Sequence, residues 1–132
     1  MTRNRSKSKT CRHLEVLRTD LTSEGDRETG QVELRVPEEL WYFKGHFDGD
    51  PVLPGVVQLD SAVLAQVERI WPDLGRLEGV RQLKFSRVIR PGEVIRVTLE
   101  RKKGAARVVC RISANQDLCT SGILSFSTVG YT

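Results

Sequence analysis

Hydrophobic and polar residues alternate on both sides of one predominantly apolar stretch. Before that stretch, residues 13–20 and 31–36 alternate with the period of two that is typical of a half-buried β-strand. The segment 22–30 between them is polar and rich in turn-forming residues. The first part of the chain is therefore predicted to form a β-hairpin.

The apolar stretch, residues 56–70, is predicted to form a helix of about four turns. Pro54 lies just before its start, where proline is tolerated, and Pro72 ends it. Its apolar residues occur almost all the way round a helical projection, which is typical of a buried helix. These residues are Val56, Val57, Leu59, Ala62, Val63, Leu64, Ala65, Val67 and Ile70.

The remainder of the chain has the pattern of four strands, at residues 79–89, 94–102, 106–115 and 118–128. Turns are expected at residues 90–92 and 103–105, so the four strands are predicted to form a meander. Two strands, one buried helix and four further strands indicate an α+β fold. We therefore expect a hotdog fold, in which an antiparallel sheet wraps around one long central helix.

Composition indicates one domain, at residues 12–132, preceded by a disordered basic tail at residues 1–11. Five of the 21 basic residues, and no acidic residue, lie within residues 1–13, which leaves 16 basic against 17 acidic side chains in the remaining chain. Because the body is nearly neutral and contains no nucleic-acid recognition motif, no nucleic-acid partner is expected.

No apolar run approaches the ~18 residues that cross a bilayer, and the basic start lacks the apolar region of a secretory signal. Three cysteines without CxxC spacing fit a reducing compartment, so a cytoplasmic location away from membranes is expected. Two distant histidines indicate no metal site, and the glycines form no phosphate or dinucleotide loop. No cofactor is therefore predicted.

The segment 45–60 concentrates the chemistry of the chain, beginning with His46. An isolated histidine is often a hydrogen-bonded structural residue. An imidazole with a pKa near ~6.5 can also accept a proton near neutral pH, and the surrounding Pro and Gly residues would hold it in place. Both interpretations of His46 stay open at this point.

Asp60 lies about one turn inside the predicted helix, among apolar neighbours. It could be a structural carboxylate that the first-turn amides and the helix dipole satisfy. Alternatively, burial raises its pKa so that the carboxyl can carry a proton.

Gly55 lies where the loop becomes the helix, so its N–H is expected to point outward without an internal partner. With no side chain, Gly55 could let a carbonyl oxygen approach this N–H and stabilise a developing enolate. The structural alternative is that Gly55 only permits the turn.

The segment 40–55 resembles the Asp-type branch of the 3-hydroxyacyl-[acyl-carrier-protein] dehydratases, similar to the 3-hydroxydecanoyl type, through the pattern GHFxGxPxxPGxxxx[DE]. Residues 83–87 and 90–93 also resemble the family's strand and turn after the helix. The resemblance covers about residues 30–127 and looks closest to the small dehydratases of aryl polyene gene clusters.

This resemblance implies that His46 removes the α-proton and that Asp60 of the opposite subunit protonates the departing hydroxyl of a 3-hydroxyacyl thioester. The amide of Gly55, with that of Val56, would hold the thioester carbonyl. It further implies a homodimer with shared active sites and an acidic acyl-carrier protein as the partner. Basic residues at the tunnel mouth would then meet that partner. The candidates are Lys84, Arg87 and Arg90, which could equally serve only to keep an exposed strand soluble.

The chain departs from the family at Leu64, where the family usually has a Gln four residues after its catalytic acid. Gln58 and Gln66 are the nearest glutamines, and Gln66 is expected to point elsewhere on a helix. Two further hypotheses therefore stand beside the dehydratase: an acyl thioesterase on the same fold, and a non-catalytic subunit that binds the carrier protein.

Overall fold

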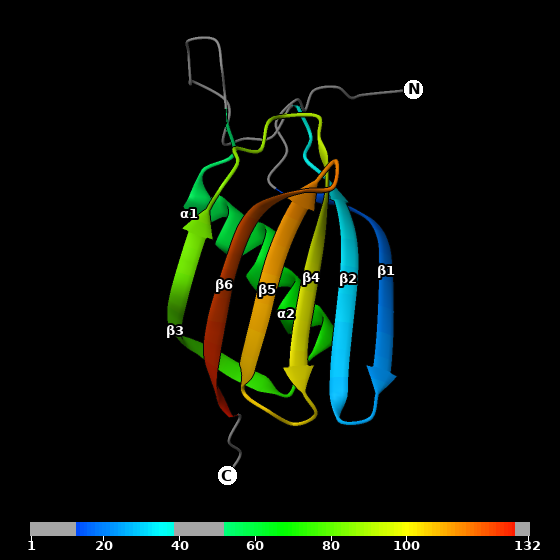
Figure 1. The fold of residues 1–132 in the computed structure, drawn as a ribbon, viewed down its shortest axis with the longest axis vertical. Coiled ribbons are helices and arrows are strands. Elements are labelled where there is room, and N and C mark those ends of the chain that lie inside the picture. Colours follow the sequence, from blue (N-terminus) through cyan, green and yellow to red (C-terminus); the bar gives the residue numbers. More distant parts are fainter. Residues whose placement is uncertain (1–12, 39–51, 129–132) are drawn as a thin grey trace, which may run out of the picture.

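The computed structural model describes residues 13–38 and 52–128. In this part of the chain, six strands form one antiparallel sheet that curves around a helix (Figure 1). The strands are β1 (Glu15–Glu24), β2 (Arg27–Arg35), β3 (Leu74–Phe85), β4 (Val94–Lys102), β5 (Arg107–Ala114) and β6 (Asp117–Thr128). This arrangement confirms the predicted hotdog fold.

The order of the strands in the sheet is β1-β2-β4-β5-β6-β3. The prediction of a four-strand meander is therefore wrong, because β3 pairs with β6 and β4 lies between β2 and β5. The helix follows β2 in the chain and crosses the face of the sheet, after which the chain enters the far edge as β3 (Figure 1). Of the four strands that follow the helix, only β4, β5 and β6 pair consecutively.

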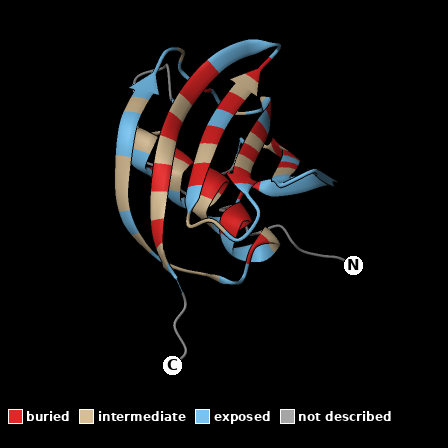
Figure 2. Cartoon of the chain, turned by 60° about the horizontal axis from the view of Figure 1, so that its bottom comes forward, coloured by how far each residue is buried: buried red, intermediate tan, exposed pale blue. Residues whose placement is uncertain are grey.

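Alternation along the central strands separates the helix-facing side of the sheet from its outer side (Figure 2). On β4, Ile95, Val97 and Leu99 are fully buried, whereas the residues between them are exposed or half-buried. The predicted turn at residues 103–105 is confirmed, with Gly104 at φ +77°. Asn115 has φ +51° and begins a tight connection from β5 to β6. Sequence alternation thus places one face of each central strand in the core.

Two predicted boundaries are wrong. The segment 22–30 is not a long turn, because the β1–β2 ladder continues through it to the pair Glu24–Arg27. Polar residues suit these strand ends because the side chains of β1 are almost all exposed. The strand predicted at residues 79–89 begins at Leu74 and ends at Phe85, and Ile89 is buried in the loop that follows.

The helix runs continuously through α1 (Gly55–Val57), a π-helical segment η3 (Gln58–Leu64) and α2 (Ala65–Ile70), close to the predicted 56–70. The prediction that it is buried all round is wrong. Val57, Ala62 and Val63 face the core, whereas Val56 is 72% exposed. A single sheet covers one side of the helix and leaves the other side open. No helix in the described part of the chain is long and apolar enough to span a bilayer.

Candidate active site

The helix begins with two backbone amides that have no acceptor among the described residues. Pro54 is the N-cap residue, with φ −63°, and its carbonyl accepts hydrogen bonds from the N–H groups of Val57 and Gln58, both at 3.0 Å. The earlier amides, of Gly55 and Val56, precede the first intrahelical hydrogen bonds. As predicted, Gly55 is therefore at the junction of loop and helix, where amides carry a partial positive charge.

A close contact with Phe85 explains why residue 55 is a glycine. A Cβ atom at Gly55 would lie 2.7 Å from Cζ of the Phe85 ring. The φ angle of Gly55 is not in the left-handed region, so the turn itself does not require glycine there. The absence of a side chain at Gly55 therefore allows the Phe85 ring to lie close to the start of the helix, and it is not required by the backbone conformation of the turn.

Gly55, Gln58 and Phe85 line a cavity of about 350 Å³ between the start of the helix and the end of β3. Its other lining residues are Val52, Leu53, Pro54, Ser86, Arg87 and Val88. A mainly apolar hollow with a few polar groups is the usual form of a small-molecule site. This cavity, which we call the glycine cavity, lies beside the amides at the helix start.

Asp60 lies on the open side of the helix, and the prediction that it is buried is wrong for the single chain. The side chain of Asp60 has no hydrogen bond or ion pair within the described residues, so the first-turn amides do not satisfy it either. It lines a second cavity, of about 550 Å³, between the helix and the beginning of β1. We call this hollow the aspartate cavity.

Leu64 and Gln66 also line the aspartate cavity. Leu64 is half-buried, so the position at which the family usually has Gln does lie near Asp60. Gln66 is buried, and its Oε1 accepts hydrogen bonds from Nη2 and Nε of Arg69 at 2.7 and 3.2 Å. Gln66 is thus buried where Asp60 is exposed, and Arg69 already occupies its carbonyl oxygen, so no role toward Asp60 is assigned to Gln66.

Gly55 and Asp60 line different cavities, so a single chain does not bring the two together. His46 lies outside the described residues, as does the predicted basic tail at residues 1–11. No group of three or more His, Cys, Asp or Glu that could hold a metal ion occurs in the ranges 13–38 and 52–128.

The three predicted carrier-protein residues differ in their surroundings. Lys84 and Arg90 are exposed. Arg87 is half-buried and pairs with Glu93, with 2.9 Å between Nη2 and Oε2. The hydrogen bond from Arg87 is the main reason why the pKa of Glu93 is lowered from its ordinary value of 4.5. Much of the charge of Arg87 is therefore already balanced within the chain.

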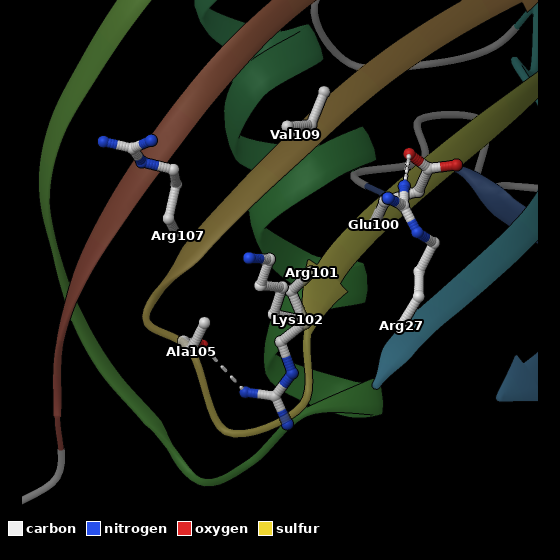
Figure 3. A pocket seen from close by; sticks show the side chains of 7 residues that line it. All are labelled: Arg27, Glu100, Arg101, Lys102, Ala105, Arg107 and Val109. Atoms are coloured by element: carbon white, nitrogen blue, oxygen red, sulfur yellow. Dashed lines mark hydrogen bonds and ion pairs between the residues drawn. The ribbon is translucent and has the colours of Figure 1, made fainter. Parts of the chain in front are cut away.

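A third cavity, of about 410 Å³, lies at the β4–β5 hairpin, far from the start of the helix (Figures 1 and 3). Arg101 lines it, with its side chain only 6% exposed and paired to Glu28 and Asp73 at 2.9 Å each. Its Nη1 also donates to the Ala105 carbonyl, and its guanidinium lies 4.7 Å from the centre of the Trp71 ring. These contacts connect the end of the helix to the sheet and indicate a structural role.

Sequence reasoning missed Gln58 and Phe85, which line the glycine cavity, and Thr120, whose hydroxyl donates a hydrogen bond to Gln58. Gln58 gave a signal, as a polar residue between Val57 and Leu59 in an otherwise apolar segment. Thr120 and Phe85 gave none, because only the pairing of β6 with β3 brings these strands to the same part of the fold.

The fold defines this chain as a hotdog protein, and its central helix begins with two amides that have no acceptor among the described residues. Residues 22–123 match the family model described as "ApeI-like: ApeI dehydratase". The chain therefore belongs to the ApeI-like dehydratase family, which confirms the resemblance seen in the sequence.

A curated relative agrees with this assignment, and two solved structures resemble the fold. The 3-hydroxyacyl-[acyl-carrier-protein] dehydratase FabZ of Levilactobacillus brevis is 30% identical over 118 residues, covering 83% of this chain and 78% of that protein. The crystal structure of an uncharacterized protein from Erwinia carotovora subsp. atroseptica has a TM-score of 0.79 at 25% identity, covering 88% of this chain and 97% of that one. The dehydratase heterocomplex ApeI:P from Xenorhabdus doucetiae shares the fold, with a TM-score of 0.68 at 18% identity, covering 83% of this chain and 98% of that one.

Proposed function

We propose that this protein dehydrates 3-hydroxyacyl thioesters carried on acyl-carrier protein to trans-2-enoyl thioesters, in fatty-acid or aryl polyene biosynthesis. The observation that carries the proposal is the family match over residues 22–123, which includes the segment that holds Gly55 and Asp60. The free amides at the start of the helix, beside an apolar cavity, support it further because dehydration passes through an enolate.

In the proposed reaction, His46 takes the proton from C2 of the substrate, and the electron pair moves toward the thioester carbonyl. The amides of Gly55 and Val56 stabilise the negative charge on that oxygen. The C3–O bond then breaks as Asp60 gives its proton to the departing hydroxyl, so that one water leaves and the C2–C3 double bond forms. The chemistry needs no cofactor because every transferred proton has a side chain to carry it.

We infer that the active unit is a homodimer in which Asp60 works with His46 of the partner subunit. Support comes from the open side of the helix, where Val56 and Asp60 are exposed and Leu64 is half-buried. The neighbouring edge strand β3 has twelve residues, none of them fully buried. Long open edges and uncovered apolar surface favour association with another chain.

We propose that the acidic carrier protein approaches the glycine cavity, where the exposed side chains of Lys84 and Arg90 are candidate contacts. Arg87 is expected to contribute less, because Glu93 already pairs with it. A cytoplasmic location, the compartment that reduced thiols favour, is part of the same proposal.

The test is incubation of the purified protein with 3-hydroxyacyl thioesters, followed by the ultraviolet absorbance of the conjugated enoyl product. His46→Ala and Asp60→Asn are expected to lower turnover by at least about 100-fold, since each removes a general acid or base. Turnover at the wild-type level in either folded variant would contradict the assigned roles. Release of free thiol from saturated acyl thioesters, without dehydration, would indicate the thioesterase, and binding without turnover the non-catalytic subunit.

Mixing the two variants tests the shared site. When the two variants are unfolded and refolded together in equal amounts, about half of the dimers contain one chain of each variant. In each mixed dimer, one site combines the unchanged His46 of one chain with the unchanged Asp60 of the other, and the second site carries both substitutions. Activity should therefore return to about one quarter of the wild-type value. If each site used His46 and Asp60 of the same chain, the mixture would stay inactive.

A further inference from the structure

Gln58 is a buried amide that connects three parts of the fold. Only 3% of its surface is exposed. Its Nε2 donates to the Leu53 carbonyl at 3.1 Å, and its Oε1 accepts from the Thr120 hydroxyl at 2.5 Å. Thr120 on β6 is fully buried. Buried polar side chains are retained where their partners are fixed, so Gln58 joins the loop before the helix to the sheet.

The contact with Leu53 fixes the backbone just before the helix. The N–H of Leu53 donates to the Ile89 carbonyl at 2.7 Å, and its carbonyl accepts from Gln58. Both backbone groups of Leu53 are therefore held: its N–H by the loop after β3, and its carbonyl by the helix. Pro54 follows with its φ angle restricted by the ring, so the direction of the Gly55 amide depends on where Leu53 is held.

Gln58 also lines the glycine cavity together with Gly55. Its hydrogen bonds therefore act at the place where the substrate carbonyl is proposed to bind. Amides stabilise an oxyanion only when their N–H groups point at it before the reaction begins. A shift of about 1 Å in such a group can lower the rate by about 100-fold.

We propose that Gln58 and Thr120 form a positioning pair that orients the Gly55 and Val56 amides toward the thioester carbonyl. This inference rests on the proposed dehydratase function. Neither residue is expected to touch the reacting atoms: Gln58 acts through Leu53, and Thr120 holds the amide of Gln58 in the required orientation.

The first test compares Thr120→Val, which removes the hydroxyl at nearly constant shape, with Thr120→Ser, which keeps it. In steady-state dehydration, Thr120→Val should reduce kcat by about 10-fold and change KM by less than about 3-fold. Thr120→Ser should retain most of the wild-type kcat. Thr98→Val provides a control, because Thr98 lies on the outer face of β4 and should not affect kcat. An unchanged kcat in Thr120→Val would overturn the proposal.

The double variant Gln58→Met with Thr120→Val keeps the test valid where a single change impairs folding. Replacing both partners of the Gln58–Thr120 hydrogen bond by apolar groups of similar shape leaves only the Leu53 carbonyl without its donor, so the fold should be retained. The contact with Leu53 is lost, and kcat should fall by about 100-fold. A folded double variant with wild-type kcat would refute the inference.

Hydrogen exchange separates this proposal from the proposed function. The amides of Leu53 and Val57, which donate to the Ile89 and Pro54 carbonyls, should exchange at least about 10-fold faster in the double variant than in the wild type, whereas those of β4 should not change. If the wild type fails to dehydrate any 3-hydroxyacyl thioester, the proposed function is wrong, while faster exchange still shows that Gln58 fixes this segment. Unchanged exchange overturns the positioning role whatever the activity.

Discussion

Replacing Arg101 by methionine should reveal how strongly the end of the helix is bound to the sheet. Methionine fills similar space but removes the ion pairs with Glu28 and Asp73 and the stacking on Trp71. The side chain of Asp73 is 57% exposed, so its pair is worth only about 0.5 kcal/mol. That of Glu28 is 23% exposed, and its pair with the buried guanidinium is worth about 1 kcal/mol. The stacking contributes about 0.5–1 kcal/mol.

Together these contacts predict that Arg101→Met lowers the free energy of unfolding by about 2–2.5 kcal/mol. For a chain of this size the loss corresponds to a fall in melting temperature of roughly 10 °C. Thermal unfolding followed by circular dichroism, at equal protein concentrations because association shifts the midpoint, measures it. Arg96→Met is the matched control on the same strand, because Arg96 is 54% exposed and its pair with Glu33 should contribute under about 0.5 kcal/mol.

Acid titration provides a second measurement of the same contact. The hydrogen bond from Arg101 is the main reason why the pKa of Asp73 is lowered from its ordinary value of 3.8. A lowered pKa stabilises the folded state fully above the unfolded value, and this contribution is lost as the pH falls through the folded value. The difference in the free energy of unfolding between wild type and Arg101→Met should therefore be constant from about pH 5 to 8. It should become smaller below pH 3.8, as Asp73 is protonated. Equal melting temperatures of Arg101→Met and wild type at pH 7 would refute the reasoning.

Three further predictions concern the site and the core. Gly55→Ala should change the melting temperature little, because the half-exposed Phe85 ring can move. It should lower kcat at least about 10-fold, because the added methyl group blocks the approach of the substrate carbonyl to the amides. An unchanged kcat would argue against an oxyanion site at the start of the helix. Leu64→Gln, beside Asp60 in the aspartate cavity, should raise turnover severalfold by hydrogen bonding to the carboxyl, and a fall in turnover in stopped assays would contradict this. Burial raises the pKa of Cys110 to about 11, so mass spectrometry should find it unalkylated in the native protein at pH 8 and alkylated in urea; rapid native alkylation would show that the sheet opens.

Much of the fold could be predicted because local pattern and burial agree in the central strands. The boundaries of β4 match the predicted 94–102, since alternation there continues from the first residue to the last. The prediction failed for β3, which begins at Leu74 and lies at the edge of the sheet. An edge strand with no fully buried residue need not alternate between hydrophobic and polar residues, so its start is not visible in the sequence. Its partner strand cannot be predicted from local sequence either.

The site was predicted in part. Gly55 is at the start of the helix as its neighbours implied, because proline and the first-turn amides act locally. The burial of Asp60 was predicted wrongly, since the apolar residues around the helix gave no indication that the sheet covers only one side. Phe85 explains the glycine at residue 55 from 30 positions away in the chain, a distance over which periodicity carries no information.

The sequence by itself determined the hotdog class, the extent of the helix and the family of the segment 45–60, because alternation, proline positions and a dense motif are local properties of the chain. Only the tertiary structure decided that β3 lies beside β6 and that Asp60 faces outward. It also decided that Gly55 and Asp60 open into different cavities, and that Gln58 meets Thr120 from 62 positions away. These features depend on which surfaces the curved sheet covers and which it leaves open, and such coverage is fixed by the packing of distant segments rather than by any single one.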